Sequence, residues 1–157
     1  MTRDSDFKQV VRARMAGTGE TYTAARAGVE AEAERSQRRA AYDGARAEQE
    51  RLVGRLFTDG RIERVPGKRK VRAAVLLEVV SRFEPGRDYA EPEVNDILLG
   101  VHEDFAYLRR ELVNYRYLER EAGRYRTATH APVRSAIEHQ EIPAWEAHWL
   151  QGFLDGR

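Results

Sequence analysis

Two polar side chains that can read DNA bases, Arg110 and Asn114, lie four residues apart in a segment with helical periodicity. Residues at this spacing share one face of a helix, and Tyr107 lies on the same face. Arginine can pair with guanine, and asparagine with adenine, through two hydrogen bonds each, while a tyrosine can contact a phosphate or a thymine methyl. We therefore predict Tyr107, Arg110 and Asn114 as candidates for reading bases. The alternative is that these residues only form the solvated face of a helix.

Positive side chains that could contact phosphates lie in two places. They are Lys68, Arg69, Lys70 and Arg72 at the start of an apolar segment, and Arg124 and Arg126 in an expected hairpin. The first group is the densest positive cluster in the chain, and helix N-termini disfavour cations. This conflict slightly favours an anionic partner such as the phosphates of duplex DNA, although a solvated run of charge is the alternative.

Arg109 and Arg120 are expected to support the fold instead. Arg109 falls on the flank of the apolar face of its helix, so an ion pair with Glu93 or Asp96 of the preceding helix is its expected role. Arg120 is expected to pair within the domain.

No enzyme site is predicted. The chain has no cysteine, which excludes disulfides, cysteine-ligated zinc and thiol catalysis. His139 and His148 are nine residues apart, so on one helix they point in opposite directions and cannot share a metal. We find no nucleophile beside a base, and we expect no cofactor and no metal.

Charge and hydropathy limit the other classes of protein to which the chain could belong. The net charge of +1 conceals an excess of +3 in residues 51–128, which is modest for a nucleic-acid-binding domain. No apolar run approaches the roughly 20 residues that span a bilayer, and the first residues lack the apolar stretch of a signal peptide. A cytoplasmic protein without a membrane partner is expected.

Periodicity then supplies the elements that position these residues. Helices are expected at 4–16, 71–83, 91–101 and 105–115. A further helix is expected from about 20 to 50, with an interruption near Asp43 and Gly44. A strand is expected at 61–65, and a hairpin is expected from 117–121 and 124–127. The expected fold is mainly α with a small β-hairpin. A winged helix-turn-helix core at 51–128 has a helical N-terminal extension at 1–50 and a C-terminal amphipathic helix at 129–157.

The C-terminal segment has a large aromatic face. Trp145, Trp149 and Phe153 recur every fourth residue, so they lie on one side of a helix. This face must be buried, either against a second copy in a homodimer or against the protein's own domain.

Residues 57–126 resemble a bacterial family catalogued as domain of unknown function 2087. The matching positions are Phe57, Gly60, Arg61, Pro66, Lys68 to Arg72, Phe83, Arg87, Tyr89, Glu91, Glu93 to Asn95, Leu98, His102, Asp104, Leu108 to Arg110, Leu112, Val113, Leu118, Arg120, Gly123, Tyr125 and Arg126. The resemblance implies a small winged-helix-like domain of the kind found in transcription regulators. Ala90 departs from the pattern, because a serine or threonine cap is expected there.

Three functions remain open. The leading hypothesis is a transcription regulator that binds duplex DNA, acting as a dimer. A protein-interaction adaptor on a winged-helix scaffold is the second, and an RNA- or ribosome-associated binding protein is the third.

Overall fold

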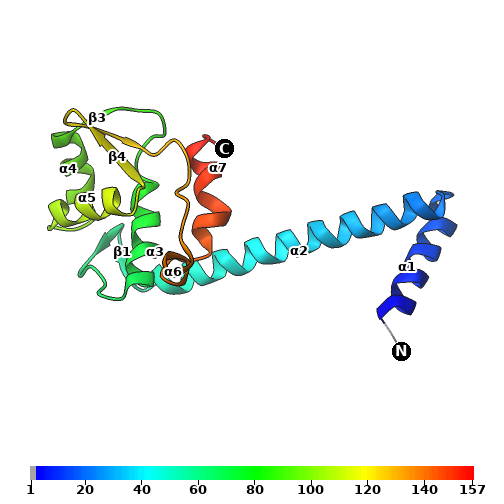
Figure 1. Cartoon of the computed structure of the whole chain (residues 1–157). Helices are drawn as coiled ribbons and strands as arrows, with labels where there is room; N and C mark the ends of the chain where they lie inside the picture. Colours follow the sequence, from blue (N-terminus) through cyan, green and yellow to red (C-terminus); the bar gives the residue numbers. More distant parts are fainter. Residues whose placement is uncertain (1–2) are drawn as a thin grey trace. The chain divides into compact units, whose positions relative to one another are not determined.

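The chain divides into two compact units, residues 1–43 and 44–157, in a computed structural model that describes residues 3–157 (Figure 1). The helices are α1 (Arg3–Thr18), α2 (Tyr22–Val53), α3 (Arg69–Val80), α4 (Glu91–Leu99), α5 (Phe105–Asn114), α6 (Ala136–Gln140), the π-helical turn η1 (Glu146–Leu150) and α7 (Gln151–Leu154). The strands are β1 (Phe57–Thr58), β2 (Arg61–Ile62), β3 (Tyr89–Ala90), β4 (Leu118–Glu121) and β5 (Arg124–Thr127). The expected class, mainly α with a small β-hairpin, is confirmed.

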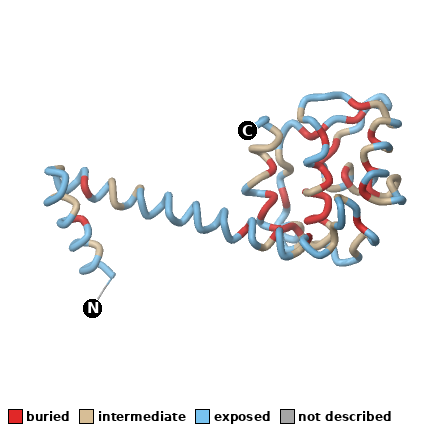
Figure 2. The backbone as a smooth tube through the Cα atoms, turned by 180° about the vertical axis from the view of Figure 1, so that it is seen from behind, coloured by how far each residue is buried: buried red, intermediate tan, exposed pale blue. Residues whose placement is uncertain are grey.

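The first unit is a helical hairpin with very little core. Gly19 turns the chain with a φ of 73°, and the Thr21 hydroxyl accepts a hydrogen bond from the Ala24 N–H at the start of α2. Within residues 3–43 only Val11 and Ala25 are buried, and most other positions are exposed (Figure 2). The hairpin therefore gains little from apolar burial.

Helix α2 is continuous, so the interruption predicted near Asp43 and Gly44 is wrong. A single glycine costs a helix about 1 kcal/mol relative to alanine. That cost is small beside the alanine, glutamate and arginine content of α2, and ion pairs such as Arg46–Glu50 at 3.0 Å support it further. No helix within residues 3–157 is both long enough and apolar enough to cross a membrane.

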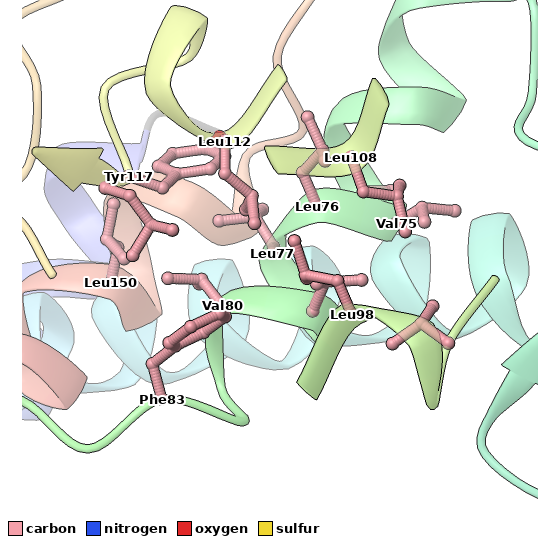
Figure 3. Close-up of a cluster of buried hydrophobic side chains, with 14 of the residues drawn as sticks. Val75, Leu76, Leu77, Val80, Phe83, Leu98, Leu108, Leu112, Tyr117 and Leu150 are labelled. Atoms are coloured by element: carbon pink, nitrogen blue, oxygen red, sulfur yellow. The ribbon is translucent and has the colours of Figure 1, made fainter. Parts of the chain in front are cut away.

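The second unit is built around α3. Seven of its residues are buried, because its sequence is apolar around most of the helix. Figure 3 shows Leu76 and Leu77 of α3 facing Leu108 and Leu112 of α5, with Leu98 of α4 in the same cluster. Helices α4 and α5 therefore pack on α3 through these apolar side chains, and their opposite faces are exposed to solvent.

Three of the strands, β1, β2 and β3, differ from the predicted ones. The strand expected at 61–65 is only the two-residue β2, which pairs with β1 in a separate hairpin. The partner of the β4–β5 hairpin is β3, in the order β3-β5-β4, with Tyr89 opposite Tyr125. A strand of two residues is too short to show alternating polar and apolar residues, so the sequence pattern did not predict β3. The resulting order, α3, β3, α4, α5 and a hairpin, places a strand beside the hairpin.

The C-terminal segment is not one continuous helix. Residues 128–135 are non-helical, and α6 is separated from the last helical stretch, Glu146–Leu154, by a short break. Leu150 is fully buried and lies beside Tyr117 (Figure 3). Trp145 is also buried in this core, and Trp149 and Phe153 pack against it. The aromatic face therefore packs on its own domain, with Trp145 buried and Trp149 and Phe153 partly buried. A homodimer through what remains exposed of this face stays a prediction.

Candidate nucleic-acid interface

The turn before α5 fixes the helix that carries the predicted base-reading residues. The Asp104 carboxylate accepts a hydrogen bond from the Tyr107 N–H at 3.1 Å and caps α5. Nδ1 of His102 accepts the Asp104 N–H at 3.0 Å, so Nε2 carries the ring proton and can donate to the Glu63 carbonyl at 3.3 Å. The histidine thus ties the turn to the segment after β2.

The start of α4 is held by a partial cap. The Glu93 carboxylate accepts a hydrogen bond from the Ala90 N–H at 2.7 Å. This bond, more than the neighbouring Arg87, holds the pKa of Glu93 below its usual range. Alanine has no side-chain acceptor, so only this half of a capping box is present.

Two of the three base-reading candidates lie together. Arg110 and Asn114 are exposed on the outer face of α5, and both line a cleft of about 290 Å³ with Arg120 and Tyr125 of the hairpin. Arg110 makes no ion pair with any residue in 3–157. The Asn114 amide donates to Glu111 at 3.0 Å. Tyr107 is half-buried and does not line this cleft.

The neighbouring Arg109 has the supporting position expected of it, with different partners. Its guanidinium donates to the Asn95 side-chain oxygen and lies 3.3 Å from Glu91, both in α4. The predicted partners Glu93 and Asp96 were wrong. Glu91 also lies 3.7 Å from Arg120, so Arg120 pairs within the domain as expected.

Most of the predicted phosphate contacts already face carboxylates of the same chain. The pairs are Arg69–Glu141 at 2.9 Å, Lys70–Glu48 at 3.3 Å, Arg72–Glu111 at 3.2 Å and Arg126–Glu119 at 3.0 Å. Lys68 is exposed, and Arg124 is exposed with only a 3.5 Å contact to the Asp88 carbonyl. The structure therefore leaves Lys68 and Arg124 as the predicted contacts without an ion pair in residues 3–157.

A second group of arginines was missed in the sequence. Arg55, Arg61 and Arg64 line a cleft of about 670 Å³ together with His102 of the turn before α5, and two carboxylates, Glu63 and Glu103, line it as well. None of the three makes an ion pair with a described residue, and Arg61 donates to the Leu99 carbonyl at 2.7 Å. The three arginines are spread over a loop and a hairpin, so they form no run. The only signal was that Arg61 and His102 both belong to the family pattern.

Comparison with known proteins supports the family resemblance and gives no information on function. Residues 61–127, somewhat less than half of the chain, match the model of a family described as an uncharacterized protein conserved in bacteria (DUF2087). The family predicted from the sequence is thus confirmed for this segment, which contains α3, the α4–α5 pair and the β4–β5 hairpin. Neither a curated protein nor a solved structure gives a significant match.

Proposed function

We propose that the domain of residues 51–128 binds duplex DNA through the outer face of α5 and acts as a transcription regulator. The observation that carries the proposal is the exposure of Arg110, which has no ion-pair partner within residues 3–157. Its guanidinium can therefore engage a guanine edge without first breaking an ion pair, and Asn114 lies one turn further along the same face. A DNA-binding protein of a bacterial family would act in the cytoplasm, beside the chromosome.

The order of elements supports this use of α5. Helices α4 and α5 are joined by the short turn at 100–104, and the β4–β5 hairpin follows directly. In helix-turn-helix proteins the second helix lies in the major groove. Arg110 and Asn114 are the sixth and the last residues of α5, so the proposal has the middle and the C-terminal end of this helix facing the bases. In the proposal, the hairpin contacts the DNA backbone beside that groove.

Phosphate contacts would come from basic residues that make no ion pair within residues 3–157. Arg55, Arg61 and Arg64 lie around the turn that leads into α5, and Lys68 and Arg124 are exposed elsewhere on the domain. Phosphate contacts position a protein on the duplex while base contacts specify the sequence. In the proposal, the arginine cleft therefore sets the position of α5 in the groove.

A protein-interaction adaptor is the second candidate. The observation that favours it is the pairing of Arg69, Lys70, Arg72 and Arg126 with carboxylates of the same chain. These pairs weaken the positive field that nucleic-acid binding uses.

One experiment distinguishes the regulator from the adaptor. Bound duplexes are selected from a random-sequence pool, and their binding is then titrated across a salt series. A regulator is expected to enrich a defined sequence and to lose affinity with salt, by about 0.9 log units per decade for each phosphate contact. RNA should compete poorly. Binding no tighter than a Kd of about 10⁻⁴ to 10⁻⁶ M, with no enriched sequence, would instead favour the adaptor.

A further inference from the structure

The short acidic helix α6 lies against the basic start of α3. Both carboxylate oxygens of Glu141, which follows α6, lie 2.9 Å from Nη1 of Arg69. Glu138 accepts a hydrogen bond of 2.5 Å from Arg116, the second residue after α5. Arg69, Glu138 and Glu141 line a cleft of about 270 Å³ that extends to Asn114 of α5. Two carboxylates of the C-terminal segment therefore occupy a basic cleft next to the proposed base-reading face.

The hold on α6 itself is weak. None of its residues is buried, and Ile137 is 74% exposed. The side chains of the Arg69–Glu141 pair are 64% and 39% exposed. Glu138 adds the exposed pair with Arg116 and a long contact of 3.5 Å with Arg134. Exposed ion pairs contribute little net stability, so α6 can leave the cleft at a small cost.

The residues on both sides of α6 are, in contrast, firmly held. Arg134 binds both carboxylate oxygens of Glu146 at 2.9 and 2.8 Å, and these side chains are 3% and 6% exposed. Ile142 is buried on the other side of α6. The segment 135–141 can therefore move while its two ends remain fixed to the domain.

The same guanidinium groups suit phosphates. An arginine fork binds carboxylate and phosphate oxygens with similar geometry. Release of the counterions condensed on duplex DNA adds a driving force that a carboxylate of the same chain does not have.

We propose that the basic cleft beneath α6 is a second phosphate-binding surface, which Glu138 and Glu141 occupy until duplex DNA displaces them. This inference rests on the proposed binding of DNA. Because Asn114 lines the same cleft, DNA backbone in it would continue directly from the bases read by α5. Helix α6 then sets the affinity of the domain by competing with DNA.

Neutralising the two carboxylates tests the proposal. The variants are Glu141→Gln and the double variant Glu138→Gln/Glu141→Gln, and the probe is a short labelled duplex followed by fluorescence anisotropy. Glutamine retains the capping role of residue 138 with Ser135. We expect about two- to five-fold tighter binding for the single variant. A steeper salt dependence, by about 0.9 log units per decade, is also expected because Arg69 gains a phosphate.

Glu50→Gln is the matched control. It changes the net charge equally and frees Arg46 from an exposed ion pair of similar length, 3.0 Å. We expect no change in affinity, and thermal melts of all variants should coincide with that of the parent. An equal gain in Glu50→Gln would overturn the proposal, since net charge alone would explain it. Unchanged affinity of both Glu141 variants beside a parent that binds DNA would overturn it and leave DNA binding intact. No binding by any variant would overturn both.

Discussion

The Tyr117 hydroxyl donates a hydrogen bond of 2.5 Å to the Glu146 carboxylate. This contact joins the residue before β4 to the first residue of η1, 29 positions later. Arg134 contacts the same carboxylate, so one buried group connects the hairpin, the segment before α6 and the C-terminal helix. The C-terminal segment is therefore an integral part of the domain.

Replacement of Glu146 by alanine should destabilise the protein strongly. The change leaves the buried Arg134 guanidinium without its carboxylate, and breaking a buried pair in this way costs about 3–5 kcal/mol. Urea denaturation measures the free energy of unfolding. Glu119→Ala, which breaks the exposed pair with Arg126, is the control and should cost less than about 1 kcal/mol. Similar losses in the two variants would contradict the role given to Glu146.

Tyr117 should make the protein sensitive to alkali. Burial, more than the nearby Glu146, raises the pKa of Tyr117 far above its usual value. An unfolded tyrosine ionises near pH 10, whereas the folded one stays neutral. The stability that Tyr117 contributes is thus complete below pH 10 and falls as the pH rises above it. Denaturation at pH 8 to 11 should show this decline in the parent and a smaller one in Tyr117→Phe. Parallel declines would refute the assignment.

Arg109 and Arg110 should have opposite phenotypes. Arg109→Ala removes the contacts to Asn95 and Glu91 and should cost about 1–3 kcal/mol of folding free energy. Arg110→Ala removes an exposed side chain and should change stability by no more than about 0.5 kcal/mol. Thermal or chemical denaturation of the two variants decides this, and a larger loss for Arg110→Ala would disprove the division of roles.

Removal of residues 1–43 should leave the second unit folded. Every residue of the main apolar core lies at position 45 or beyond. The fragment 44–157 should melt within about 4 °C of the whole chain, which corresponds to roughly 1 kcal/mol. A fragment without a cooperative thermal transition would show that the first unit is required for folding.

The sequence predicted the parts of the fold that have strong local signals. The helix expected at 71–83 corresponds to α3, and the helix expected at 105–115 corresponds to α5. The continuity of α2 through Gly44 could not be read locally, because it depends on the propensity of the whole helix. The two-residue β3 was equally hidden, since only its pairing with β5 defines it.

The candidate site was predictable only in part. The helical spacing of Arg110 and Asn114 correctly placed both on the exposed face of α5. The pairing of Arg69 with Glu141 joins residues 72 positions apart, and no spacing rule reveals such a contact. For the same reason, the convergence of Arg55, Arg61 and Arg64 on one cleft became visible only in three dimensions.

The affinity of Arg110→Ala for duplex DNA tests the central proposal most directly. The measurement compares parent and variant on the duplex enriched by the parent and on the same duplex with each guanine replaced in turn. If α5 reads bases, the parent should lose about 1–3 kcal/mol of binding free energy at one guanine, and the variant should be insensitive to that change. Arg46→Ala, at an exposed arginine of α2, should behave as the parent. Equal sensitivity of the parent and Arg110→Ala at every guanine would contradict the account.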